Sequence, residues 1–361
     1  MIEYENLGRL NQVFFDEYQD TFRDFLDSGW YILGKKVKQF EEEYARYCQT
    51  SFCAGVANGL DAITISLNAL QLEPGSEVIV PSNTYIATIL GILHNGFVPV
   101  LVEPDIRTYN IDPLKIEENI SSTTKAILVV HLYGKVCDME NICLLASKYN
   151  LKIIEDCAQA HGAKFKGQIA GSFGTFGAHS FYPTKNLGAL GDAGAITCND
   201  PYFDEKVRTL RNYGSKIKYH NDVVGYNSRL DEVQAAFLSV KLRRLNEIND
   251  HKRDLAKIYN DNLKEEFIKP QIYPDFFDVY HIYNIRHPER DKLKEYLLKH
   301  GVMTEIHYPI PPHKQNALQG ILNHTEYPIA TEIHATTLSL PISYIHNNDE
   351  IYEVIEVLNK F

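Results

Sequence analysis

The sequence is poor in the residue patterns that mark redox and metal proteins. Its 361 residues include six cysteines, and no two of them form a C-x-x-C pair. The 14 histidines show no H-E-x-x-H or comparable spacing, so we expect no metal site. The charged first thirty residues contain no secretory apolar region. We therefore expect reduced cysteines that serve as buried filler, with a nucleophilic role for Cys157 as the alternative.

Basic clusters and long apolar runs are missing as well. The net charge is −11 and lysines and arginines do not cluster, which argues against a nucleic-acid partner. The most apolar stretch, residues 86–102, is interrupted by polar residues, by Gly96 and by Pro99, so it is too broken to span a membrane. We expect a cytoplasmic protein, and its length allows two lobes.

Apolar runs alternate with helical patterns through the first two thirds of the chain. Strands are predicted over residues 77–81, 98–102, 126–131 and 151–155, with a helix over 139–149. Continuous apolar strands separated by helices indicate an α/β fold with a large, mostly parallel sheet covered on both faces. Charged helical segments follow, such as residues 240–263, and a strand is predicted at 282–286. We predict a large domain over residues 1–240 and a smaller C-terminal α+β domain over residues 241–361.

A lysine and an aspartate carry the strongest chemical signal. Asp156 ends a predicted buried strand, where parallel sheets bind their ligands, although a helix cap is the alternative role. Lys185 lies 29 residues later in a run bounded by Pro183 and Gly188. Pyridoxal phosphate needs this combination, because an amine forms the Schiff base and a carboxylate keeps the pyridine nitrogen protonated. The pair predicts a pyridoxal phosphate enzyme.

Other polar residues lie where they could complete such a site. Asn58 and Gly59 begin a predicted helix whose free amides suit a phosphate, and Ser180 and Asn227 could add side-chain contacts. Tyr85 follows a predicted strand and could stack on the cofactor ring. Gln159 lies one helical turn after Asp156 and could donate to the phenolate oxygen. Taken alone, such residues are more often caps, turn, core or surface residues than parts of a site.

Five motifs in this order carry a resemblance that covers nearly the whole chain. They begin at Asn58, Pro81, Glu155, Ser180 and Gly225. Together the motifs resemble the DegT/DnrJ/StrS family of sugar aminotransferases. The resemblance implies a pyridoxal phosphate enzyme of fold type I that works as a homodimer with shared active sites.

The resemblance also implies a role for each motif residue. Lys185 becomes the catalytic Schiff-base lysine, Asp156 the partner of the pyridine nitrogen, and Gln159 the partner of the ring oxygen. Tyr85 stacks on the ring. Phosphate contacts fall to the amides of Gly59 and Leu60, to Ser180, and to Asn227 reaching across from the neighbouring subunit. Many relatives have threonine in place of Leu60, so only its amide remains available here.

Residues 211–225 look closest to the enzymes that aminate carbon 3 of a dTDP-linked 3-keto-6-deoxyhexose with L-glutamate as donor. Tyr182, His307 and Tyr308 match polar and aromatic residues of that subgroup's sugar pocket, with a structural turn before Pro309 as the alternative for the last two. The other readings are amination at carbon 4, a dehydratase or deoxygenase of the same fold, and a non-catalytic regulator. The retained Lys185 counts against the deoxygenase branch, which has histidine there.

Overall fold

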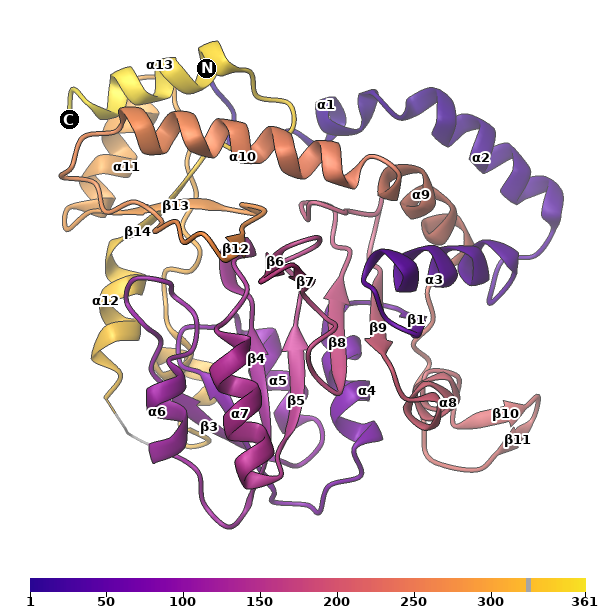
Figure 1. Cartoon of the computed structure of the whole chain (residues 1–361). Coiled ribbons are helices and arrows are strands. Elements are labelled where there is room, and N and C mark those ends of the chain that lie inside the picture. The colour runs from indigo at the N-terminus through magenta and orange to yellow at the C-terminus, as the bar shows by residue number, and fades with distance from the viewer. Residues whose placement is uncertain (323–325) are drawn as a thin grey trace.

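A seven-stranded sheet forms the centre of the molecule (Figure 1). The computed structural model describes residues 1–322 and 326–361. The strands of the sheet, in spatial order, are β1 (Phe52–Val56), β9 (Gly194–Cys198), β8 (Phe176–Ser180), β5 (Lys152–Asp156), β4 (Thr124–Val130), β2 (Glu77–Pro81) and β3 (Val98–Val102). Strand β9 is antiparallel to both of its neighbours, and the pairs from β8 to β3 are parallel. The predicted mostly parallel α/β sheet is confirmed.

Helices cover both faces of the sheet. Helices α4 (Gly59–Ala69) and α5 (Ile86–Leu93) lie behind it in Figure 1, and α6 (Pro113–Glu118) and α7 (Met139–Tyr149) lie in front. Alternate strand residues therefore enter different cores: Val78 packs in the cluster that contains Ile63 of α4, while Ile79 packs in the cluster that contains Ile142 of α7. Burial on both faces explains why these strands are continuous apolar runs.

The predicted elements around the sheet agree closely with the structure. Strands β2 and β3 and helix α7 have the predicted bounds, and β4 and β5 differ by one or two residues at their ends. The predicted helical segment over residues 240–263 is two helices, α9 (Glu232–Leu242) and α10 (Leu245–Asn262), separated at Arg243 and Arg244. The break lets α9 pack on α2 and α3 while α10 packs on α13.

The C-terminal part builds a second core beside the sheet. It contains α10, α11 (Arg290–Lys299), α13 (Asn348–Leu358) and the strand pair β13 (Tyr283–Arg286) and β14 (Thr337–Leu340), and the N-terminal residue Ile2 packs into it. Helix α12 (Pro328–Thr336) departs from this arrangement, because its Ala330 packs in the core of the large sheet. The division of the chain at residue 240 stays a prediction.

The smaller elements lie around this framework. The other helices are α1 (Leu7–Gln12), α2 (Phe15–Ser28), α3 (Lys35–Tyr47), α8 (Pro201–Leu210), η1 (Leu132–Gly134), η2 (Pro312–Lys314) and η3 (Asn316–Leu318). The other strands are β6 (Lys164–Phe165), β7 (Gln168–Ile169), β10 (Ser215–Ile217), β11 (His220–Asn221) and β12 (Phe276–Phe277). The β10–β11 hairpin projects from the body beyond α8, and the two chain ends lie near each other beside α13 (Figure 1).

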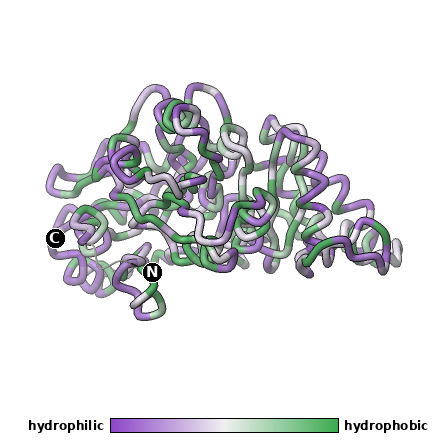
Figure 2. The backbone as a smooth tube through the Cα atoms, turned by 90° about the horizontal axis from the view of Figure 1, so that it is seen from below, coloured by the Kyte–Doolittle hydropathy of each residue, from purple (hydrophilic) through white to green (hydrophobic). Residues whose placement is uncertain are grey.

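Hydrophobic stretches run through the middle of the molecule, and many of the outer coils are hydrophilic (Figure 2). None of the helices in the described part of the chain is both long and apolar enough to cross a membrane. All six cysteines are free, and all except Cys143 are buried. Burial raises the pKa of each thiol.

Candidate active site

Asp156 occupies the carboxyl end of β5, at the edge where a parallel sheet binds its ligands. Its Oδ2 accepts a hydrogen bond from the hydroxyl of Thr88 at 2.9 Å, and its Oδ1 accepts one from the amide of Ala158 at 3.1 Å. Burial raises the pKa of the carboxyl group, and these two bonds and the charge of Lys185 oppose the rise. No ion pair of Asp156 occurs within residues 1–322 and 326–361, so a cationic group of a ligand would complete its surroundings.

Lys185 lies in the tight loop that follows β8. A Cβ at Gly188 would come within 2.2 Å of the carbonyl oxygen of Pro183, so only glycine allows the loop to close there. The Nζ atom of Lys185 lies 3.3 Å from Nε2 of His281. Burial lowers the pKa of the amine to about 8, although Asp156 and Glu5 raise it. A lysine with this pKa can exchange a proton near neutral pH.

Gln159 connects the sheet to the C-terminal part of the chain. Its Oε1 accepts a hydrogen bond from the amide of Tyr133 at 2.7 Å, and its Nε2 donates one to the hydroxyl of Tyr308 at 3.0 Å. The ring of Tyr308 also meets the ring of Tyr85, with centroids 5.0 Å apart and planes tilted by 32°. Tyr85 is half exposed. The amide of Gln159 therefore has a fixed orientation, and one N–H of its Nε2 is left for a ligand.

The start of α4 and the end of β8 form a cradle for an anion. Asn58 caps the helix, because its side chain accepts from the amide of Asp61 at 2.8 Å. The amides of Gly59 and Leu60 precede the first helical hydrogen bonds and can therefore bind an acceptor from outside the helix. A Cβ at Gly59 would lie 2.5 Å from Cβ of Ser180, which shows how closely Ser180 approaches the helix start.

A chain of hydrogen bonds fixes the strand that carries Ser180. The carbonyl oxygen of Ser180 accepts from Nε2 of His161 at 2.8 Å, so Nδ1 of this neutral ring accepts from the hydroxyl of Tyr44 at 2.8 Å. The Tyr44 oxygen also lies 3.0 Å from Nδ1 of His179, and Nε2 of His179 lies 3.0 Å from the hydroxyl of Thr197. Burial lowers the pKa of His161 to about 4 and that of His179 well below its usual range. Both rings are therefore uncharged at neutral pH.

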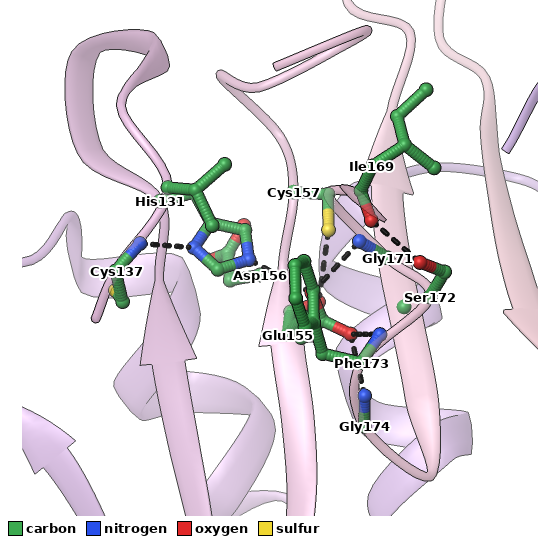
Figure 3. Close-up of polar contacts among 12 residues, drawn as sticks. His131, Cys137, Glu155, Asp156, Cys157, Ile169, Gly171, Ser172, Phe173 and Gly174 are labelled. Atoms are coloured by element: carbon green, nitrogen blue, oxygen red, sulfur yellow. Dashed lines mark hydrogen bonds and ion pairs between the residues drawn. The ribbon is translucent and has the colours of Figure 1, made fainter. Parts of the chain in front are cut away.

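The side chains of His131, Glu155 and Cys157 lie close together around the end of β5 (Figure 3). His131 donates from Nε2 to Glu155 at 2.9 Å, and its Nδ1 accepts from the amide of Cys137 at 3.1 Å. Glu155 also accepts from the backbone amides of Gly171, Phe173 and Gly174 at 2.7–2.8 Å. Both nitrogens of His131 and both oxygens of Glu155 are therefore engaged, and the cluster serves to anchor the loop beside β5.

The predicted sugar-pocket residues lie at different depths. Tyr182 is half exposed and lies next to the loop of Lys185. The backbone amide of Lys185 donates a hydrogen bond to the carbonyl oxygen of Tyr182. His307 is partly buried, and its Nδ1 lies 2.9 Å from the hydroxyl of Ser339. Its pKa is lowered to about 4 by burial and by the positive charge of Lys185. Tyr308 reaches Gln159, so this segment belongs to the same site as the lysine.

Asn227 lines a hollow beside the residues that precede α4. Its side chain is exposed, and the hollow of about 330 Å³ also includes Ala57, next to the capping residue Asn58. The hydroxyl of the neighbouring Ser228 accepts a hydrogen bond from the amide of Ala57 at 3.1 Å. A role for Asn227 in the phosphate cup of a second subunit stays a prediction.

These residues fit pyridoxal phosphate. Asp156 is a buried carboxylate without a cationic partner in the described chain, Gln159 has a donor to spare, and the cradle of Gly59 and Ser180 suits a phosphate. Lys185 is the amine between them. The sequence reasoning missed Thr88 and His281, although Thr88 lies one helical turn after Thr84 in a motif already singled out. No signal in the sequence linked His281 to Lys185.

Comparisons with known proteins agree with this arrangement. The model of the DegT/DnrJ/EryC1/StrS aminotransferase family matches residues 14–359. The dTDP-3-amino-3,6-dideoxy-alpha-D-galactopyranose transaminase of Aneurinibacillus thermoaerophilus is 52% identical, over 100% of this chain and 99% of its own length. The erythromycin biosynthesis sensory transduction protein EryC1 of Saccharopolyspora erythraea is 44% identical, over 89% of this chain and 88% of its own.

A solved structure gives the same result for the fold. The Streptomyces venezuelae protein DesV, determined in complex with a ketimine intermediate, superimposes with a TM-score of 0.97. The superposition covers 99% of this chain and 98% of DesV at 39% identity. A fold match over this length includes both the large sheet and the C-terminal core.

Proposed function

Because the chain belongs to the DegT/DnrJ/EryC1/StrS aminotransferase family, we propose that it moves an amino group from L-glutamate to carbon 3 of a dTDP-linked 3-keto-6-deoxyhexose. Enzymes of this family use pyridoxal phosphate. The observation that carries the proposal is the meeting of Lys185, Asp156 and Gln159 at one edge of the sheet, where Tyr308 joins them. The activity named for the Aneurinibacillus relative supports both the sugar and the position of the amino group.

The cofactor and the side chains divide the chemistry. When bound, pyridoxal phosphate supplies an electron sink that stabilises negative charge on the carbon that loses a proton. Asp156 would keep the ring nitrogen protonated, because a buried carboxylate gains a positive partner there. Lys185, with a pKa of about 8, can take up a proton as the amine and return it as the ammonium ion. Gln159, oriented by Tyr133, would donate to the ring oxygen.

The remaining residues would bind and shield. The amides of Gly59 and Leu60 and the hydroxyl of Ser180 would hold the phosphate, since a helix start favours an anion. Tyr85 would stack on one face of the cofactor ring, with Tyr308 beside it to exclude water. The fixed Tyr44, His161 and His179 chain would keep Ser180 in place.

The position of the amino group depends on how the hexose is seated. Small rotations of the sugar ring exchange carbon 3 for carbon 4, so a few polar contacts must select one seating. His307 and Tyr182 flank Lys185 from different elements and are the groups we assign to this selection. His307 is uncharged at neutral pH and can bond to a sugar hydroxyl next to the ketone.

The proposal is tested by single turnover of the pyridoxamine form with 3-keto and 4-keto dTDP-sugars. We expect faster amination of the 3-keto isomer. His307→Ala and Tyr182→Phe should lower kcat/KM for the sugar at least about tenfold more than kcat/KM for glutamate, because only the sugar contacts change. Equal or faster amination of the 4-keto isomer would reassign the position and leave the aminotransferase activity intact.

A homodimer with shared sites is part of the same proposal. The segment that follows α8 carries exposed apolar side chains, including Ile217, Tyr219 and Val224, whose exposed fractions are 68%, 86% and 95%. Such a projecting apolar patch supports an interface. Light scattering should give twice the chain mass, and Asn227→Ala should weaken cofactor binding in the dimer. A monomer with full activity would contradict the shared site.

A non-catalytic regulator is the alternative from another class, since the Saccharopolyspora relative is named a sensory transduction protein. A regulator has no chemical need for Lys185, Asp156 and Gln159 together. Loss of the cofactor's visible absorbance after the addition of glutamate would favour the enzyme, and an unchanged spectrum would favour the regulator.

A further inference from the structure

His281 lies against the reacting amine but has no part in the roles described so far. Its Nε2 is 3.3 Å from Nζ of Lys185. Its other ring nitrogen, Nδ1, is buried and has no hydrogen-bond partner in the described chain. A buried nitrogen without a partner weakens a fold, so the ring is poorly explained by stability alone. Its contact with Lys185 is the one polar contact of the ring that the described residues provide.

The backbone of His281 is tied to the loop that carries the lysine. Lys252 of α10 donates to the carbonyl oxygen of His281 at 3.1 Å and to Oδ1 of Asn186 at 3.0 Å. Asn186, the neighbour of Lys185, donates to the carbonyl oxygen of Val279 at 2.9 Å. These three bonds keep the two segments in register, so the distance between the His281 ring and the Lys185 amine is set by the framework.

The turn that leads into His281 is also constrained. Tyr280 has φ +43°, a left-handed conformation that a tyrosine adopts only when its surroundings enforce it. Gly134 (φ +101°) packs closely against this turn, since a Cβ there would lie 2.9 Å from the backbone nitrogens of Tyr280 and His281. The amide of Val279 donates to the carbonyl oxygen of Gly134 at 3.0 Å. The histidine is therefore held from the sheet side as well as from α10.

The charges around the ring keep it neutral. Burial lowers the pKa of His281 well below its usual range, and the positive charges of Lys185 and Lys252 lower it further. A neutral ring can accept a hydrogen bond at Nε2, whereas a charged ring cannot. The titratable groups that act on this pair from the surrounding elements are Glu5, Asp156, His161, Lys252 and His307.

We propose that His281 is a positioning residue for Lys185: its Nε2 accepts a hydrogen bond from the lysine amine whenever that amine is not bonded to the cofactor. A lysine side chain has four flexible carbons, and a released amine would otherwise rotate among many positions. Holding it in one direction keeps it within reach of the carbon atoms between which it moves a proton. The inference rests on the proposed aminotransferase function but does not depend on which sugar is the acceptor.

The test measures the lysine directly, in the dimer from which the cofactor has been removed. Competitive acetylation with limiting acetic anhydride over pH 6–11, read by mass spectrometry of the Lys185 peptide, gives the pKa of this amine. In His281→Leu we expect the pKa to fall by about half a unit or more, because the protonated amine loses an acceptor. His281→Gln, which keeps an acceptor oxygen, should restore most of the wild-type value. His300→Leu, at an exposed histidine of the surface, is the control and should change nothing.

Two further measurements separate positioning from folding. The free energy of unfolding of His281→Leu should equal or exceed that of the wild type, since an unpaired buried nitrogen is removed. The glutamate half-reaction of the reloaded enzyme should slow about tenfold in His281→Leu and recover in His281→Gln. An unchanged Lys185 pKa in His281→Leu would overturn the proposal. So would equal loss of stability in both variants. If the keto sugar is not aminated but the pKa falls and the glutamate half-reaction slows as described, the assigned acceptor is wrong and the positioning role stands.

Discussion

Burial acts in opposite directions on the two residues that define the site. It raises the pKa of Asp156 and lowers that of Lys185, so in each group burial favours the form that carries no charge. Both pKa shifts are partly opposed, because hydrogen bonds from Thr88 and Ala158 stabilise the carboxylate of Asp156 and this carboxylate stabilises the ammonium form of Lys185. A ligand with a positive ring nitrogen and an electrophilic carbon would satisfy both residues.

Lys185→Ala should abolish turnover and the visible absorbance of the bound cofactor, because one amine serves as Schiff-base partner and proton carrier. The fold should remain intact, since the substitution removes a charged group that burial desolvates. Turnover and unfolding are measured against Lys292→Ala, an exposed lysine of α11. Retention of more than about one hundredth of the wild-type rate would remove Lys185 from this role.

Asp156→Asn should keep the cofactor but lose most of the activity, by about a hundredfold or more, because an amide does not stabilise a protonated ring nitrogen. Thr88→Val should have a smaller effect in the same direction, since it removes one donor to the carboxylate. Steady-state rates and cofactor content are measured for both variants. A near-normal rate in Asp156→Asn would mean that the ring nitrogen does not need its proton.

At the scale of the elements, the site depends on how helix α12 is anchored to the sheet. Glu103, which follows β3, accepts hydrogen bonds from the amides of Ile329 and Ala330 at the start of α12, at 2.8 and 3.0 Å. The same helix carries His334, whose Nδ1 donates to the carbonyl oxygen of Tyr308 at 2.6 Å. The carboxylate thus caps a helix far away in sequence and indirectly holds the tyrosine that meets Gln159.

Glu103→Ala should lower the free energy of unfolding by about 1–2 kcal/mol, because the helix start loses its cap and its favourable charge. It should also raise KM for the sugar more than KM for glutamate, since Tyr308 loses its support. Denaturant unfolding and steady-state kinetics check this against Glu118→Ala on the exposed side of α6. Equal stability of the two variants would show that the cap is dispensable.

The elements that could be predicted are those whose pattern comes from burial. Strands β2 and β3 and helix α7 follow directly from apolar runs and helical spacing. The break between α9 and α10 could not be read from Arg243 and Arg244, because arginine is a good helix former and the break comes from packing against different partners. His281 was missed for a related reason: nearly one hundred residues separate it from Lys185, and only the folded chain brings them together.

The whole molecule carries three buried lysines near the site, Lys185, Lys241 and Lys252, and burial lowers the pKa of each to about 8. In the unfolded chain a lysine titrates near 10.4. Between these values the unfolded state binds more protons than the folded state, so the free energy of unfolding rises with pH. Each lysine contributes at most about 1.4 kcal/mol per pH unit in this window.

Lys241→Met isolates this effect, because Lys241 bonds only to Asn11 and to the carbonyl oxygen of Gly188 among the described residues. The wild type gains stability from about pH 8 upward through deprotonation of Lys241, and the variant lacks this gain. The free energy of unfolding of the variant minus that of the wild type should therefore be largest at pH 7 and smaller at pH 9.5. Urea unfolding at both values checks the sign, and a difference that does not change with pH would mean that the folded state leaves the pKa of Lys241 unshifted.

The low reactivity of the native thiols has a practical consequence. Five of the six cysteines are buried, and all six have raised pKa values, so few thiolates are available to react at neutral pH. A single cysteine introduced at Val224 in the segment after β11, or at Leu114 on α6, would carry a maleimide dye without removal of the natural residues. Protection of the first position and not the second as subunits associate would trace the outline of the contact between them.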